Sequence, residues 1–163
     1  MAARDEKSGR AGSSNSWIEI PDLSSGQLAL SSVLIGGRAQ SSSTDPVTNT
    51  AKPIDPVQLS VAHNFSARDY LRFLVYVYNA ARAQADGKPD VAIQVQVVRD
   101  NQPVVTTPLR KLSLEGIEDL SQLPYAAEIS LEGLAAGRYL LQLTVVDRVS
   151  KSSASQQTRF EIE

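Results

Sequence analysis

Alternation of apolar side chains with a period of two is the feature that most limits what this chain can fold into. Strand side chains point to opposite faces in turn, whereas helical ones recur every three to four residues. The alternation recurs in six short segments, at residues 57–61, 71–77, 91–97, 127–131, 139–145 and 160–162. Turn signals separate them, and no long amphipathic helix interrupts them. The sequence therefore predicts an all-β fold.

One segment is apolar on both faces. Leu71, Phe73, Val75 and Val77 share one face, and Leu74, Tyr76 and Tyr78 share the other. A strand of this kind is covered on both sides or lies under amphipathic tyrosines, so we expect it in the centre of a sheet. Helix is the alternative at residues 70–79, because Ser66 with Asp69 resembles an N-terminal cap. Aromatic and β-branched residues dominate, and they favour strand.

Less regular segments complete the pattern. Short β-prone runs occur at residues 17–20 and 28–35, the second ended by Gly36 and Gly37. Residues 99–102 predict a tight hairpin turn into an edge strand at residues 104–107, which Pro103 and Pro108 bracket. Residues 109–123 fit neither period, and we expect a loop with a helical turn near residues 117–122.

These elements predict an antiparallel two-sheet β-sandwich of the immunoglobulin or fibronectin-III type, with about seven to nine strands. A closed barrel is the alternative. We expect one shared core, made of Phe73, Val75, Val77, Ile93, Val95, Leu141, Leu143, Val145 and Phe160. Tyr139 stands near the start of a late strand, where sandwich domains often place a tyrosine whose hydroxyl bonds back to the preceding corner. A plain core tyrosine is the other interpretation.

Composition divides the chain into a leader and one domain. Residues 1–16 are Ser, Gly, Ala and scattered charge, which predicts a flexible leader or linker. Residues 17–163 form the expected single domain, interrupted by a long polar loop at 38–56. The 163 residues suffice to bury a real core.

Charge and cysteine content exclude several classes of protein. The formal net charge is −2, so the basic excess that nucleic-acid binding requires is missing. The chain has no cysteine, which excludes a disulfide scaffold. No apolar run is long enough to predict a membrane span, and the N-terminal residues show no secretory signal.

The order of several short motifs resembles a known family. The motifs are Ile-Glu-Ile-Pro-Asp-Leu at 18–23, Phe-Leu-Val-Tyr-Val-Tyr-Asn at 73–79, Arg-Asp-Asn-Gln-Pro at 99–103, Leu-Pro-Tyr at 123–125, and Gly-Arg-Tyr at 137–139 leading to Thr-Val-Val-Asp-Arg at 144–148. Together they resemble the C-terminal β-sandwich region of the VWFA-related proteins of Acidobacteria, over residues 17–163.

That resemblance implies a context and a role. In the family a von Willebrand factor A-like domain precedes this region and the protein is exported, so the expected location is secreted or periplasmic. The metal motif of the A-like domain is not matched here, because Asp22-Leu23-Ser24-Ser25 has the wrong spacing. What the resemblance implies is an accessory module without a catalytic site, and a preceding A-like domain as a protein partner.

The residues offer little for catalysis or metal binding. His63 is the one histidine, and its neighbours predict a surface or turn position. The acidic groups Glu115, Glu118 and Asp119, and the pair Asp86 and Asp90, lie in polar turns where solvated acids are expected. A calcium loop at residues 86–90 is conceivable but has only two carboxylates. We therefore expect no enzyme, no cofactor and no metal.

Tyr70, Arg72, Tyr76 and Tyr78 form the one candidate binding face. Alternate tyrosines on one sheet face can bind sugar or protein, although they can equally be covered by a second layer, which is the interpretation the sequence favours. We expect a non-enzymatic protein-interaction module, with carbohydrate binding as the alternative. Because the edge at residues 104–107 looks protected, we expect the isolated domain to be monomeric.

Overall fold

A computed structural model describes residues 2–4, 11–13, 23–39 and 63–163. The strands expected at residues 17–20 and 57–61, the polar loop beyond residue 39 and most of the expected leader lie outside the described residues. At the N-terminus, β1 (Ala2–Arg4) pairs antiparallel with β2 (Ala11–Ser13). The 3-10 turn η1 (Leu23–Ser25) is the one helical element of the described ranges.

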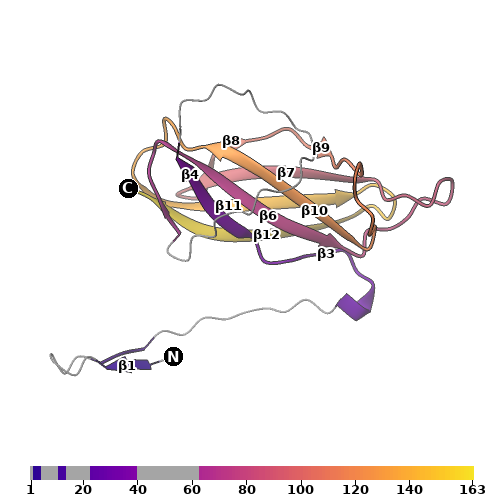
Figure 1. Ribbon diagram of the computed structural model, residues 1–163, viewed down its shortest axis with the longest axis horizontal. Helices are drawn as coiled ribbons and strands as arrows, with labels where there is room; N and C mark the ends of the chain where they lie inside the picture. The colour runs from indigo at the N-terminus through magenta and orange to yellow at the C-terminus, as the bar shows by residue number, and fades with distance from the viewer. Residues whose placement is uncertain (1, 5–10, 14–22, 40–62) are drawn as a thin grey trace.

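Two β-sheets form the body of the molecule (Figure 1). The smaller sheet is ordered β10-β6-β3, with β4 also paired to β6; these strands are β3 (Ala29–Leu30), β4 (Leu34–Ala39), β6 (Asp69–Tyr78) and β10 (Gln122–Ser130). The larger sheet is ordered β5-β12-β11-β7-β8, with β9 also paired to β7. Its strands are β5 (Asn64–Phe65), β7 (Val91–Arg99), β8 (Gln102–Thr106), β9 (Arg110–Lys111), β11 (Gly137–Asp147) and β12 (Ser152–Ile162).

This arrangement confirms a nearly all-β, sandwich-like fold. Every strand pair in the two sheets is antiparallel except β5 with β12, which is parallel. The expected purely antiparallel sheets are therefore wrong at this one short pair. No helix in the described part of the chain is long and apolar enough to cross a membrane.

The core lies between the sheets, and the sequence predicted its centre correctly. All nine side chains expected in the core are buried in one cluster. β6 supplies its inner row from the smaller sheet, and β7 and β11 supply theirs from the larger. Beyond these nine, the buried core also includes Leu30, Val33, Ile35, Phe65, Leu112, Leu123, Leu131 and Ile162.

The expected end of a strand at Gly36 and Gly37 is wrong. Both residues lie inside β4, which pairs with β6 from Leu34 to Ala39. Gly37 is needed because the ring of buried Phe65 presses on it; a Cβ at this position would lie 3.0 Å from the ring. A glycine within a strand often marks such a close approach rather than a strand end.

The segment at residues 109–123 also differs from expectation. It contains β9 and the first residues of β10, and residues 119–122 form a single hydrogen-bonded turn, in which the Gln122 N–H bonds to the Asp119 carbonyl, rather than a helix. Its buried Leu112 donates a backbone hydrogen bond to the Val91 carbonyl, which continues the pairing with β7. The hairpin from β7 to β8 is confirmed, and Asp100 and Asn101 both have positive φ as a type I′ turn requires.

Tyr139 makes the corner bond that the sequence predicted. Its hydroxyl donates to the Ala135 carbonyl at 2.6 Å, and Arg99 donates to that hydroxyl at 3.1 Å. The ring is buried and stacks on Phe160, and the Arg99 guanidinium lies 5.4 Å from its centre. Tyr139 thus links β7, the corner before β11, and β12.

A buried carboxylate closes the opposite end of β11. Asp147 is fully buried and accepts hydrogen bonds from the backbone N–H groups of Ala81 and Val149 and from the N–H and hydroxyl of Ser150. Burial raises the pKa of this carboxyl, but the hydrogen bonds outweigh that effect and hold the pKa below its ordinary value. Ala81 follows β6, so Asp147 ties the two sheets together.

Candidate functional site

The candidate binding face lies on the outer side of the smaller sheet. The inner row of β6 faces the core, so its other row points away from the second sheet. We call this outer row the tyrosine surface; it consists of Tyr70, Arg72, Leu74, Tyr76 and Tyr78. All five side chains are half-buried. Their lateral neighbours lie on β10, β4 and β3.

Charged groups join the three strands at one end of this surface. Glu128 of β10 lies opposite Arg72 of β6, with 3.7 Å between its Oε2 and the arginine Nε. Arg38 of β4 reaches across β6 and donates to Glu128 Oε1 at 3.0 Å, and its guanidinium lies 4.8 Å from the centre of the Tyr70 ring. Two arginines share one carboxylate, so the cluster carries one net positive charge.

Apolar and aromatic side chains occupy the rest of the surface. Leu34 of β4, which is 39% exposed, lies opposite Leu74. Ala126 of β10 flanks Leu74 on the other side. The rings of Tyr76 and Tyr78 stack with centroids 6.4 Å apart. The surface therefore has an apolar centre beside aromatic rings and a charged end, which is the composition of a protein-binding patch.

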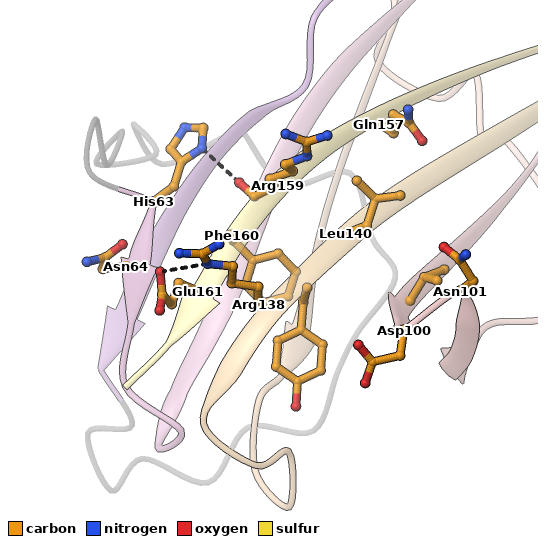
Figure 2. Close-up of a pocket in the computed structure, with 12 residues that line it drawn as sticks. His63, Asn64, Asp100, Asn101, Arg138, Leu140, Gln157, Arg159, Phe160 and Glu161 are labelled. Carbon is orange, nitrogen blue, oxygen red and sulfur yellow. Dashed lines mark hydrogen bonds and ion pairs between the residues drawn. The ribbon is translucent and has the colours of Figure 1, made fainter. Parts of the chain in front are cut away.

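The larger sheet has a polar groove on its own outer face (Figure 2). Its volume is about 710 Å³. Figure 2 shows Arg138, Leu140 and Arg159 between His63 on one side and Asn101 on the other. This groove could not be predicted from the sequence. The turn after β7 and the residues around β5 form it together with the outer rows of β11 and β12, and these segments lie far apart along the chain.

The groove lacks the features of a catalytic site. The His63 ring donates from Nδ1 to the Arg159 backbone carbonyl at 2.9 Å, so this nitrogen is used for a structural bond. Tyr139 and Phe160 border the groove, but they are only 4% and 3% exposed and cannot stack on a ligand. The pair Arg138 and Glu161 is loose, at 3.9 Å.

The acidic residues considered for catalysis or calcium do not converge. Glu115, Glu118 and Asp119 are exposed in the loop before β10, as the sequence predicted. The Ser121 hydroxyl and backbone N–H, both bonded to Asp119, hold the pKa of that carboxyl below its ordinary value.

Asp86 and Asp90 have separate partners. Asp86 accepts from the Lys88 backbone N–H at 3.0 Å. The buried Oδ1 of Asp90 lies 3.1 Å from Lys111 Nζ, an ion pair without the alignment of a hydrogen bond. Among the described residues, no group of three or more acidic, histidine or cysteine side chains could hold a metal ion.

Comparison with known proteins identifies no relative: no family model, no curated protein and no solved structure matches this chain. What the chain does must therefore be inferred from its own surfaces.

Proposed function

We propose that this chain is a non-enzymatic interaction module that binds a protein through the tyrosine surface. The observation that carries this proposal is the outward row of β6, in which three tyrosines, an arginine and a leucine are half-exposed together. Tyrosine and arginine are the residues most enriched in the energetic centres of protein interfaces. Leu34 enlarges the apolar centre, and the Arg38–Glu128–Arg72 cluster gives a polar rim.

The resemblance to the VWFA-related proteins supplies the context of the proposal. In that context the chain is an immunoglobulin- or fibronectin-III-like accessory module of an exported protein, secreted or periplasmic, and an A-like domain precedes it. A partner in the same chain is held at a high effective concentration, so a weak surface contact suffices. A half-polar surface of this size fits such a contact.

Carbohydrate binding is the alternative, and the positions of the aromatic rings weigh against it. A sugar site needs exposed rings and polar side chains in one open groove. Here the exposed rings lie on the smaller sheet, whereas the groove lies on the larger sheet and its rings are buried. The tyrosine surface with its leucines is better suited to protein.

The test compares the domain by itself with a chain in which an A-like domain precedes it. We expect the amide NMR signals of β6 and β4 to shift in the longer chain. Replacing Tyr76 by Ala should abolish the shifts, because it removes one ring of the stacked pair. Gln142→Ala, on the outer face of the larger sheet, is the matched control. Superimposable spectra, or shifts confined to the polar groove, would contradict the proposal.

The non-enzymatic part has its own test. We expect no hydrolysis of ester, peptide or glycoside substrates above background. Activity that disappears in His63→Ala or Glu118→Gln would show that a catalytic site exists.

A further inference from the structure

At the β10 edge of the smaller sheet, main-chain groups lack a partner among the residues that the structure describes. β10 pairs with β6 and, within the described residues, with no other strand. Leu131, just beyond β10, donates its N–H to the Asp69 carbonyl. This bond shows which residues of β10 direct their main-chain groups toward β6. Since alternate residues of an antiparallel strand point to opposite sides, the odd-numbered residues of β10 bond to β6 and the even-numbered ones point away. Ala126, Glu128 and Ser130 therefore direct their N–H groups outward.

Pro124 independently supports the assignment of the even-numbered residues of β10 to the outward side. A proline on an edge strand places its nitrogen on the side that faces away from the sheet, because it has no N–H to donate. Pro124 is even-numbered and lies opposite Tyr76. The remaining outward groups of β10 have no backbone partner in the described part of the chain, apart from the Gln122 N–H, which bonds to Asp119 at 3.4 Å.

β8 at the edge of the larger sheet is better protected. Pro103 lies within β8, and the register with β7 shifts between Val97 and Val98. Such irregularities and prolines discourage pairing with another strand. β10 also contains a proline, Pro124, but its register with β6 is regular over nine residues and it has no lysine.

We propose that β10 pairs antiparallel with β10 of a second copy, about a two-fold axis at Ala126. In this register Pro124 lies opposite Glu128 of the second copy, and Gln122 lies opposite Ser130. On the inner side Tyr125 lies opposite Ala127, and Leu123 opposite Ile129. Large side chains thus meet small or aliphatic ones, and no like charges face each other.

The axis at Ala126 lies at the middle residue of β10, so this register is the one that pairs all nine residues of the strand with the second copy. An axis at Glu128 places two carboxylates directly opposite each other, which is destabilising. An axis at Pro124 places two residues without N–H groups at its centre. The axis at Ala126 uses the exposed small side chain of β10 and lets the outward N–H groups of Ala126, Glu128 and Ser130 each reach a carbonyl.

The pairing has a functional consequence. The two-fold axis of an antiparallel pair is perpendicular to the sheet, so both tyrosine surfaces lie on the same side of one continuous sheet. Two linked binding surfaces raise the avidity for a partner that presents two sites. The dimer itself does not depend on the proposed function, and it replaces the monomer that the sequence predicted from the β8 edge.

The experiment measures self-association of the full chain by sedimentation equilibrium. We expect a reversible dimer that Ala126→Pro weakens at least about ten-fold, because it removes an outward N–H without touching the bonds to β6. Ala126→Lys should act similarly, since it places two like charges opposite each other. Ser155→Lys, exposed on the larger sheet, should leave the dimer intact, and so should Tyr76→Ala.

Three results would overturn the proposal. The first is a monomer at all concentrations up to the millimolar range. The second is a dimer that neither change at Ala126 weakens. The third is slow hydrogen exchange at Ala126, Glu128 and Ser130 in a monomer, because another part of the same chain would then occupy the edge. Equal unfolding midpoints for Ala126→Lys and the native protein, at a concentration too low for either to dimerise, show that lost association is not lost folding.

Discussion

The outer faces of the two sheets differ far more than their inner faces. The inner rows of β6 and β11 are both aliphatic or aromatic and buried. On the outside, β6 carries tyrosines, an arginine and a leucine. The larger sheet instead carries a row of uncharged polar side chains that crosses four strands: Gln157, Gln142, Gln96 and Thr106.

This difference between the outer faces distinguishes two groups of residues. The inner rows form the core that the fold requires, whereas the outer rows can vary and so can serve a function. Either outer row is compatible with the pleated sheet, because a strand places alternate side chains in independent environments. Amide and hydroxyl side chains keep a sheet face solvated without attracting a partner. The Tyr and Arg side chains of β6 are of types that are enriched in the energetic centres of protein interfaces. The predictions below test that separation.

The largest effect is expected from the inner rows of both sheets. Phe73→Ala and Leu141→Ala remove fully buried side chains from opposite layers of one core. Each should lower the free energy of unfolding by about 2–5 kcal/mol, as large-to-small core substitutions do. Urea unfolding measures this. A small effect for one of them would mean that its sheet is not part of the shared core.

The next effect concerns the link between the sheets at Asp147. Asp147→Asn replaces an acceptor of several hydrogen bonds by an amide, and should cost about 1.5–3 kcal/mol at neutral pH, the usual worth of hydrogen bonds to a charged group. The control is Asp100→Asn, at an exposed carboxylate in the hairpin turn after β7.

The pH dependence of the same link has a definite sign. Because the pKa of Asp147 is lower in the folded protein than in the unfolded chain, its ionised form stabilises the fold above the unfolded pKa. That contribution is lost as the pH falls below about 4, through the folded pKa. The difference in stability between the native protein and Asp147→Asn should therefore shrink in acid. A difference that grows below pH 4 would contradict the role given to Asp147.

Inner rows could be predicted from the sequence because the period of two is local. The spacing of Phe73, Val75 and Leu143 predicts that they are buried. The turn residues Asp100 and Asn101 predict the hairpin. Gly37 could not be interpreted correctly, because its reason is the ring of Phe65, which lies far along the chain.

The candidate site was harder to predict from the sequence, because it too depends on contacts between residues far apart along the chain. The alternation placed Tyr70, Tyr76 and Tyr78 on one face of a strand, but it could not say whether a layer covered that face. The Arg38–Glu128 pair links β4 to β10 across β6, which lies between them. The groove at Leu140 depends on how the loops are placed beside the larger sheet. The position of β10 at the edge of the described sheet follows from strand order, which periodicity does not encode.

A smaller loss of stability is expected from removing the hydroxyl of an inner-row side chain while its ring is kept. Tyr139→Phe keeps the buried ring and removes the hydroxyl that bonds Ala135 and Arg99. The loss should be about 1 kcal/mol, the net value of a typical hydrogen bond. Thermal or urea unfolding would detect it. An unchanged midpoint would mean that the ring alone fixes the corner before β11.

The smallest effects on stability are expected from the outer rows, and here the two faces should differ in binding instead. Arg72→Gln removes a half-exposed ion pair at 3.7 Å, and Gln157→Ala trims an exposed amide. Both should change the free energy of unfolding by no more than about 0.5 kcal/mol, because solvent screens such pairs and surface substitutions are usually mild. If the tyrosine surface binds an A-like domain placed before this chain, as proposed, Arg72→Gln should reduce the NMR shifts of β6 in the two-domain chain, whereas Gln157→Ala should leave them unchanged. Equal losses of binding in both variants would mean that the outer faces do not differ in function.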